Sequence, residues 1–333
     1  MVVRNLLQRG LLLGLSLVAL GSLALALEPT AAAQEPANGN STLKVAPLRS
    51  DLTMDPGETR TVKVTVTNPT ASELTVRPVQ NDFIAEDEKG NPAIILDEGE
   101  FAPKHSLKRF MTPIDNLVLP ANGSISVDVE LVVPANAQPG GYFGAVRFDP
   151  VDQSSGGQVN LNTSIASLIL LRVSGDAPER LTLSDFEIQQ KGRISTWYMD
   201  DKDLSMLVRF ENSGMVQLRP VAKLSILRGD EVVYDEDFNN KEQKEMILPD
   251  SARRWDVALS EVGGFGKYTA VATFTYGSKN QIIEVESSFW IIPRAVIVGG
   301  IVGILTLIAA IVGLVVYIRS RGSKTKTPRG RAR

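Results

Sequence analysis

Hydrophobic and polar residues alternate along most of the chain with a period of two. Valine alternates with threonine and lysine over residues 61–67, and larger aliphatic residues alternate with serine and acidic residues over 124–131. Such alternation predicts half-buried β-strands that present one face to a core. Turn signals rich in Pro, Gly and Asn separate these segments, as at 55–57 and 139–141. Short strands with regular turns favour antiparallel β-sandwiches with very little helix.

The pattern of strands and turns occurs twice. Three landmarks recur in the same order: a strand that ends in Asn, a Leu-Pro turn before another strand, and a late strand that carries Tyr. They occupy 64–68, 119–120 and 141–146 in the first half, and 208–212, 248–249 and 266–271 in the second. The recurrence predicts a tandem duplication. We therefore expect an all-β protein with two immunoglobulin-like sandwiches, over 43–174 and 181–290, joined by the segment 174–180.

One segment departs from the alternating pattern because it is apolar throughout. Residues 295–318 contain no charged residue, and a helix of this length crosses a hydrocarbon core of roughly 30 Å. Trp290 and Tyr317 lie near its two ends, where aromatic rings prefer the membrane interface. The tail 319–333 that follows contains seven basic residues and no acid. These features predict a single transmembrane helix, a basic cytoplasmic tail and an ectodomain outside the cytoplasm.

The N-terminus has the order of a secretory signal peptide. Two arginines precede an apolar run over 11–27, and small residues follow it. Cleavage after Ala26 or after Ala33 fits this pattern, and we assign residues 1–33 to the signal peptide and 34–42 to a flexible leader. An uncleaved signal anchor would give the same topology with one more helix. Both interpretations predict a protein of the cell membrane whose ectodomain faces outward.

Charge and cysteine content narrow the classes of function. The formal net charge of −3 hides a difference between two parts of the chain. The ectodomain has 25 basic and 37 acidic residues, whereas all charged residues of the tail are basic. An acidic exterior argues against binding of nucleic acid. The chain has no cysteine, so it forms no disulfides, thiolate zinc sites or thiol nucleophiles. Its stability must therefore come from its cores.

The longest interruption of the alternation lies in the first half, between residues 80 and 116. An acidic block over 82–100 precedes a basic block over 104–109, and the equivalent connection of the second half, 230–245, is shorter and lacks the basic block. Long connections on a rigid sandwich are functional or disordered. We expect this insert to contact a wall polymer or a partner protein, and a solvated hairpin without a partner is the alternative. The candidate binding residues are Asp82, Glu86, Asp87, Glu88, Phe101, Lys104, His105, Lys108, Arg109 and Phe110.

The insert also contains the residues that catalysis or metal binding would need. The only histidine, His105, has basic neighbours, and no nucleophile elbow accompanies it. The acidic block attracts calcium in principle, but it lacks the alternating acids and the closing Glu of an EF-hand loop, so a solvated loop is the simpler interpretation. A pair of carboxylates for glycoside hydrolysis remains an alternative, because the sequence does not give the distance between two carboxyl groups. We predict no catalytic residue, no metal site and no cofactor.

Two glycines of the apolar segment, Gly299 and Gly303, form a GxxxG pair that allows close packing of helices. A homodimer through this face is one interpretation. Since glycine is common in membrane helices, the other is that the pair has no partner.

Three features of the first half carry a family resemblance. They are an early Pro-Gly turn at 56–57, the strand that ends in Asn at 64–68 and a late Gly-Gly strand at 140–148. With the order of parts described above, the chain resembles the WxL-interacting proteins of Gram-positive cell surfaces, and pilus-chaperone-like sandwiches share the same broad pattern.

The resemblance implies a first domain associated with peptidoglycan and a second domain associated with partner proteins. The expected function is that of a non-enzymatic, membrane-anchored scaffold or adhesion protein that binds cell-wall polymer or other surface proteins. The alternative is a surface hydrolase that acts on wall glycan through carboxylates of the 82–100 block.

Overall fold

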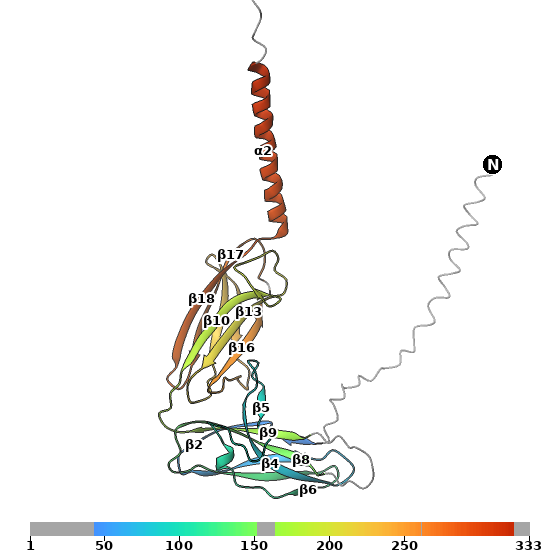
Figure 1. Cartoon of the computed structure of the whole chain (residues 1–333), viewed down its shortest axis with the longest axis vertical. Helices are drawn as coiled ribbons and strands as arrows, with labels where there is room; N and C mark the ends of the chain where they lie inside the picture. The colour runs from blue at the N-terminus through green and yellow to red at the C-terminus, as the bar shows by residue number, and fades with distance from the viewer. Residues whose placement is uncertain (1–42, 152–163, 261, 323–333) are drawn as a thin grey trace, which may run out of the picture. The chain divides into compact units, whose positions relative to one another are not determined.

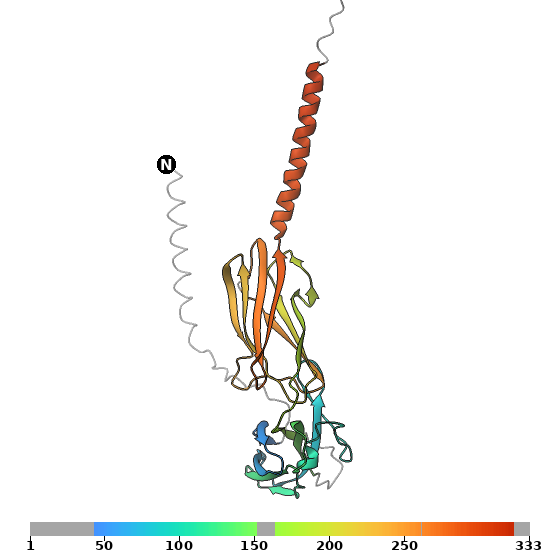
Figure 2. The ribbon, with the colours of Figure 1, turned by 90° about the vertical axis from the view of Figure 1, so that its left-hand side faces the viewer.

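The structure is a computed structural model that describes residues 43–151, 164–260 and 262–322 (Figure 1). The predicted signal peptide, the leader and most of the basic tail lie outside these residues. The described strands form four sheets, which pair into two sandwiches (Figures 1 and 2). The predicted all-β fold with two immunoglobulin-like sandwiches and one C-terminal helix is confirmed.

The first sandwich packs a three-stranded sheet against a six-stranded sheet. The smaller sheet has the order β1-β3-β7, and the larger has the order β2-β9-β8-β4-β5, with β6 also paired to β4. The elements are β1 (Lys44–Ala46), β2 (Arg49–Met54), β3 (Thr59–Thr67), β4 (Leu74–Ala85), β5 (Pro92–Ile94), the short 3-10 helix η1 (Lys108–Phe110), β6 (Leu117–Leu119), β7 (Ser124–Val132), β8 (Gly140–Pro150) and β9 (Ile165–Val173).

The N-terminal strands serve both sheets of this sandwich. β1 pairs with β3 in antiparallel fashion, the chain crosses over at the cis peptide Ala46–Pro47, and β2 then pairs with β9 in parallel. The inward residues of both sheets, such as Val64, Val129 and Phe148, are fully buried in one core. Their polar neighbours in sequence face outward, as a period of two requires.

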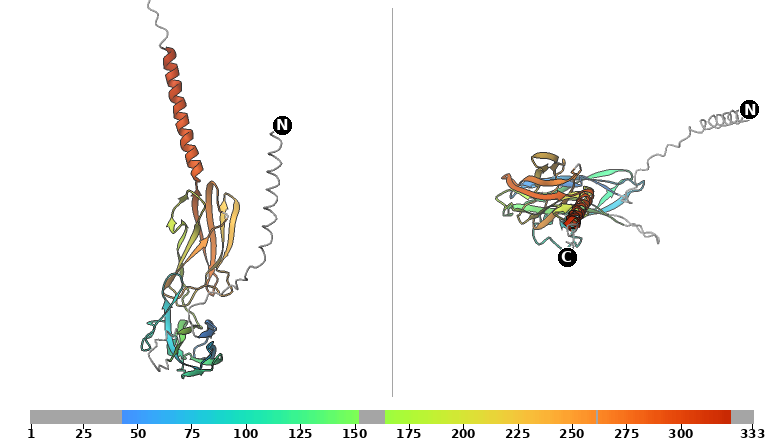
Figure 3. Two further views of the ribbon diagram at one scale, coloured as in Figure 1. Left: turned by 90° about the vertical axis from the view of Figure 1, so that its right-hand side faces the viewer. Right: turned by 90° about the horizontal axis from the view of Figure 1, so that it is seen from above.

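The second sandwich packs a four-stranded sheet against a five-stranded sheet, and Figure 3 shows its layers from two further directions. The strand orders are β11-β10-β13-β16 and β12-β18-β17-β14-β15. The strands are β10 (Leu181–Gln190), β11 (Arg193–Ile194), β12 (Trp197–Tyr198), β13 (Leu204–Asn212), β14 (Val221–Arg228), β15 (Glu231–Phe238), β16 (Ser251–Ala258), β17 (Gly266–Tyr276) and β18 (Gln281–Ile291).

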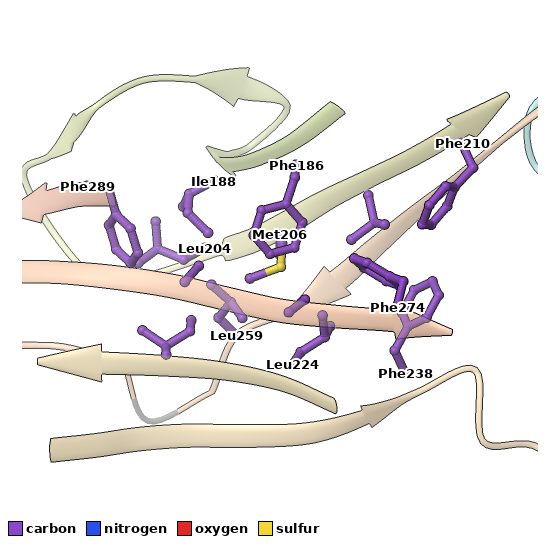
Figure 4. Close-up of a cluster of buried hydrophobic side chains, with 14 of the residues drawn as sticks. Phe186, Ile188, Leu204, Met206, Phe210, Leu224, Phe238, Leu259, Phe274 and Phe289 are labelled. Carbon is purple, nitrogen blue, oxygen red and sulfur yellow. The ribbon is translucent and has the colours of Figure 1, made fainter. Parts of the chain in front are cut away.

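Aromatic side chains dominate the core of the second sandwich (Figure 4). The ring of Phe274 lies edge-on to those of Phe210 and Phe238, with centroid separations of 4.9 and 5.4 Å. Edge-to-face pairs at these distances are favourable because the positive edge of one ring meets the negative face of the other. Phe210 comes from one sheet and Phe274 from the other, so the cluster joins the two layers.

The asparagines that end β3 and β13 make equivalent hydrogen bonds in the two sandwiches. Asn68 is fully buried, and its Nδ2 donates to the carbonyl four residues later, that of Ser72, at 2.8 Å, while its Oδ1 accepts from the N–H of Thr70. The Nδ2 of Asn212 likewise donates to the carbonyl of Val216 at 2.8 Å, and its Oδ1 accepts from Gly214. The landmark that recurs in sequence is thus a turn-closing asparagine in each half.

The two tyrosines of the late strands also have a common role. The hydroxyl of Tyr142 donates to the carbonyl of Gln138 at 2.8 Å, and that of Tyr268 donates to the carbonyls of Gly263 and Gly264. Each ring therefore ties its strand to the preceding turn, as in a tyrosine corner. Tyr268 is buried, whereas Tyr142 is only partly buried.

Helix α2 (Arg294–Gly322) follows β18 after two residues. Among the described residues it is the one helix long and apolar enough to cross a membrane, with a mean hydropathy of 2.9. Gly299 and Gly303 lie in this helix, and a Cβ built on either would meet no atom within 4 Å. The homodimer through these glycines stays a prediction.

Candidate binding site at the junction of the two sandwiches

The predicted binding insert begins inside strand β4 and is fixed there by a buried carboxylate. Asp82 is fully buried, its Oδ2 accepts from the N–H of Ala102 at 2.9 Å, and its Oδ1 accepts from the N–H of Lys108 at 2.8 Å. Beside it, the Nδ2 of Asn81 donates to the carbonyl of Ile95 at 2.8 Å. Asp82 therefore holds the insert on the first sandwich, and its carboxylate does not face solvent.

The first part of the insert is a hairpin formed by β4 and β5. At its turn, the carboxylate of Asp87 accepts from the N–H groups of Lys89 and Asn91 and from the Asn91 side chain. Gly90 completes the turn with a φ of +84°, a conformation that favours glycine. Glu86 is exposed, and its N–H bonds to the carbonyl of Asn91 across the hairpin.

The hairpin turn contacts the second sandwich through Glu88. Its carboxylate accepts two hydrogen bonds from Arg209 of β13, at 2.7 and 3.0 Å, and its carbonyl accepts from the N–H of Arg254 of β16 at 2.6 Å. The hydrogen bonds and charge of Arg209 hold the pKa of Glu88 below its ordinary value of 4.5. A second ion pair, between Lys104 and Asp250 at 2.9 Å, lies on the same side of the insert.

The rest of the basic block packs on the insert itself. The charged groups of Lys108 and Arg109 lie over the ring of Phe101, 4.7 and 4.8 Å from its centroid. Phe110 turns inward and packs on the ring of Tyr142, with a centroid separation of 4.8 Å. Of the predicted aromatic contacts, Phe101 is therefore partly exposed, and Phe110 belongs to the first core.

His105 lies in the same connection with a φ of +62°. Its Nδ1 is 2.7 Å from the carbonyl oxygen of Gly141, which makes Nδ1 the protonated nitrogen, and its Nε2 is buried without a partner. Ser106 is its neighbour and no acid within the described residues pairs with the ring. Among the described residues, no group of three or more metal-ligating side chains lies together. The arrangement fits a residue that positions the backbone of the insert.

A small apolar cluster forms where the two sandwiches meet. Phe83 of β4, Phe143 of β8 and Leu170 of β9 come from the first sandwich, and Met246 comes from the second. The rings of Phe83 and Phe143 are tilted against each other with centroids 5.9 Å apart. The cluster therefore takes buried side chains from both sandwiches.

Two arginines flank a pocket of about 90 Å³ beside this cluster: Arg49 of β2 and Arg253 of β16. The Nη2 of Arg49 donates to Asp51 at 2.7 Å, and the Nη2 of Arg253 donates to Glu245 at 2.7 Å. The Nε atoms of both arginines are buried without a hydrogen-bond partner. The pocket thus has an apolar wall and two guanidinium groups beside it, and the Nε atom of each guanidinium is buried without a partner.

The arginines around this pocket share carboxylate partners with other charged groups. Asp51 pairs with both Arg49 and Arg219, so one carboxylate serves two guanidinium groups. Burial lowers the pKa of Arg253, and the nearby positive charge of Arg49 lowers it further, although the charges of Glu245 and of Asp87, which lines the same pocket, oppose both effects. An anion in the pocket would offset the repulsion between the two arginines.

Sequence reasoning missed this pocket and found only one of its walls. The hairpin residues Asp87 and Gly90 belong to the predicted insert, but Arg49, Arg253 and Met246 come from segments that looked like ordinary strands and turns. The signal available in the sequence was weak, because Arg49 and Arg253 each lie in a strand between one apolar and one polar neighbour. Two carboxylates of the insert are already engaged, because Asp82 is buried and Glu88 is paired with Arg209.

Comparison of the sequence with family models and with curated proteins gives no match. Among solved structures, the chain is similar to the class 5 fimbriae chaperone CfaA, with 12% identity over 74% of this chain and 98% of that one, and a TM-score of 0.39. It is also similar to a chain of the Salmonella enterica SafA pilin–SafB chaperone complex, with 13% identity, coverages of 76% and 96%, and a TM-score of 0.32. A family 123 glycoside hydrolase from Clostridium perfringens matches 38% of this chain and 22% of its own length, with 17% identity and a TM-score of 0.25. Similarity at this level leaves function to be argued from the residues of the chain itself.

Proposed function

We propose that this protein is a non-enzymatic binding module, anchored in the cell membrane by α2, that captures a carboxylate of a partner protein in the pocket between Arg49 and Arg253. The observation that carries the proposal is the pair of guanidinium groups, of Arg49 and Arg253, that flank one apolar wall and whose buried Nε–H groups have no acceptor. A buried donor without a partner destabilises a protein by about 1–3 kcal/mol, so a site that contains two of them favours a ligand that supplies acceptors.

A carboxylate fits this pocket better than a neutral group does. Each of its oxygens accepts one charge-assisted hydrogen bond, and such bonds are about twice as strong as neutral ones. The wall formed by Phe83, Leu170 and Met246 would take an apolar side chain next to the carboxylate. The preferred ligand is therefore a chain terminus or an acidic side chain with an apolar neighbour.

Ion pairs between the two sandwiches support a preformed site. Glu88, Lys104 and Arg219 each make an ion pair across the junction. The joining segment is fixed too, because Glu179 bonds to Arg172 of the first sandwich and to Ser278 of the second. A preformed pocket avoids the entropic cost of ordering its walls when the partner binds.

The membrane-anchored part of the proposal follows from α2 and from the charge distribution. The helix is long and apolar enough to span, and the tail after it is basic, which favours the cytoplasmic side. The resemblance to WxL-interacting proteins agrees with this topology and stays a hypothesis. On the ground of the same resemblance, we propose that the protein belongs to a Gram-positive cell envelope.

The test compares the full-length R49Q/R253Q protein with the control R60Q/R228Q, which also removes one arginine from each sandwich. Arg60 and Arg228 lie far from the pocket in exposed ion pairs with Glu58 and Glu231. Binding of short apolar peptides with free or amidated C-termini is measured by calorimetry. We expect the free peptides alone to bind, with at least about a tenfold loss in R49Q/R253Q, since two charge-assisted bonds are removed.

Equal binding of amidated peptides, or unchanged binding by R49Q/R253Q, would contradict the carboxylate site. A parallel assay with purified wall polymer tests the alternative that the protein binds cell-wall polymer. Wall binding that neither arginine affects, with no peptide binding, would favour a polymer-binding scaffold instead.

A further inference from the structure

A group of exposed aromatic residues lies at the end of the second sandwich from which α2 leaves. Trp197, Phe265 and Trp290 expose 47, 55 and 43% of their surface, and Met199 beside them exposes 41%. By contrast, Phe210, Phe274 and Phe289 of the same sandwich are buried. We call the four exposed residues Trp197, Met199, Phe265 and Trp290 the aromatic collar.

Strand pairing brings the collar together from three parts of the chain. Trp197 of β12 is in register with Trp290 of β18, and these two strands run in parallel. Phe265 immediately precedes Gly266, the first residue of β17, which pairs with Ile291. The rings of Phe265 and Trp290 are 6.4 Å apart. Met199 lines a shallow hollow with Ile291, Pro293 and Arg294.

The connection to α2 fixes the collar close to the start of the predicted membrane span. The N–H of Ile292 still bonds to the carbonyl of Tyr198 at 2.8 Å, and the N–H of Val296 already bonds to the carbonyl of Pro293 at 2.8 Å. From Trp290 to Ala295, the first residue of the uncharged stretch, a fully extended chain spans at most about 17 Å. The interfacial region of a bilayer is roughly 5–8 Å deep on each side of the hydrocarbon core. If α2 crosses a membrane, this short connection would keep the collar within or near the headgroup layer.

We infer that the aromatic collar is a lipid-contacting surface, which inserts Trp197, Phe265 and Trp290 into the interfacial layer of the membrane that α2 crosses. The inference rests on the proposed anchoring by α2 and does not depend on the arginine pocket. Tryptophan suits this layer because its ring is apolar and its N–H finds acceptors among headgroups.

The charges next to the collar agree with a neutral lipid surface as the partner. Arg294 lies 3.8 Å from Asp200, so the first cation of the helix has an acidic neighbour on the sandwich. Asp201 and Lys202 flank the same hollow with opposite charges. The contact would thus depend on aromatic insertion and not on attraction to anionic lipid.

Fluorescence of the full-length protein in phosphatidylcholine vesicles tests this inference, with nitroxide groups placed on the lipids either near the headgroup or near the chain end. The chain has three tryptophans, so three double Trp→Phe variants leave Trp197, Trp255 or Trp290 as the single reporter. A fourth variant, L305W in a background without other tryptophans, reports on insertion of α2. Melting curves confirm that each variant is folded.

We expect the shallow nitroxide to remove most of the fluorescence of Trp197 and Trp290 and to leave that of Trp255 unchanged. The deep nitroxide should quench L305W. Unquenched Trp197 and Trp290 together with quenched L305W would overturn the collar and leave the anchor intact. Emission that shifts with protein density in the vesicles, without quenching by lipid, would show that a second copy covers the collar and would also overturn the inference. If L305W is not quenched, the anchor and the collar both fail.

Discussion

Strand β4 of the first sandwich and strand β14 of the second occupy equivalent places, next to the late tyrosine-bearing strand, yet different connections follow them. β14 returns at once as β15 through a short turn at Gly229, whereas β4 continues into a hairpin and a long loop that ends at β6. The asparagine and tyrosine bonds are the same in both sandwiches. Thus the common fold does not need the insert, and the additional residues join the two halves.

The largest expected effect concerns the two tyrosines. Tyr268 is buried and stacks on Phe289 at 5.4 Å, whereas Tyr142 is partly exposed and packs on Phe110 of the insert. Y268A should destabilise the second sandwich by about 4 kcal/mol, as truncations of buried aromatic residues do, and Y142A should cost the first sandwich about half as much. Denaturant unfolding of the two variants measures both values, and an equal loss would show that the two corners do not differ in burial.

The asparagines should come next, with equal effects in the two sandwiches. N68A and N212A each leave several buried carbonyl and N–H groups without partners, which costs roughly 3 kcal/mol in total. The matched control is N240A, because Asn240 is exposed and bonds only to Asp237. A much smaller loss for either buried asparagine would mean that its turn is held by other contacts.

Asp82 tests whether the insert is fixed to the first sandwich. D82A frees the N–H groups of Ala102 and Lys108 and should destabilise the insert by about 2–3 kcal/mol, while the tyrosine and asparagine contacts stay in place. Limited proteolysis should then cut within 86–110 in D82A and not in the exposed control D97A. Resistance equal to that of the unmodified protein would show that the contacts at Glu88 and Lys104 hold the insert without Asp82.

The smallest effect is electrostatic and depends on pH. The pKa of Glu88 is lowered in the folded protein, so its contribution to stability is present above the ordinary value of 4.5 and is lost as the pH falls below it through the folded pKa. Because the pair with Arg209 is largely exposed, the effect should be below about 1 kcal/mol and should weaken in high salt. E88Q should flatten this part of the pH–stability curve, and an unchanged curve would assign the acid sensitivity to other carboxylates such as Glu179.

Periodicity was sufficient for the architecture, because each strand carries its own alternation and each sandwich its own turn signals. The exchange of β1 and β2 between sheets was outside its reach, since the change of pairing partner from β3 to β9 is a tertiary event. The insert was recognised as an exception, but its partner was not, because Glu88 and Arg209 are distant in sequence and their pairing is a tertiary event. The same limit hid Arg49 and Arg253: each is an unremarkable polar position in its own strand, and only the meeting of β2 and β16 leaves their Nε atoms without acceptors.

The direct passage from β18 into α2 has a mechanical consequence. Along the second sandwich, β10 begins at Leu181 beside the joining segment, and β18 ends at Ile291 beside the helix. β18 is paired with β17 in register from Gln281 to Ile291. A load applied to the first sandwich while α2 is held would pull along β10 and β18, perpendicular to the hydrogen bonds that β10 makes with β13 and that β18 makes with β17. Because that geometry loads the bonds of a whole ladder together and not one after another, the second sandwich would resist such a load better than a ladder that opens from one end.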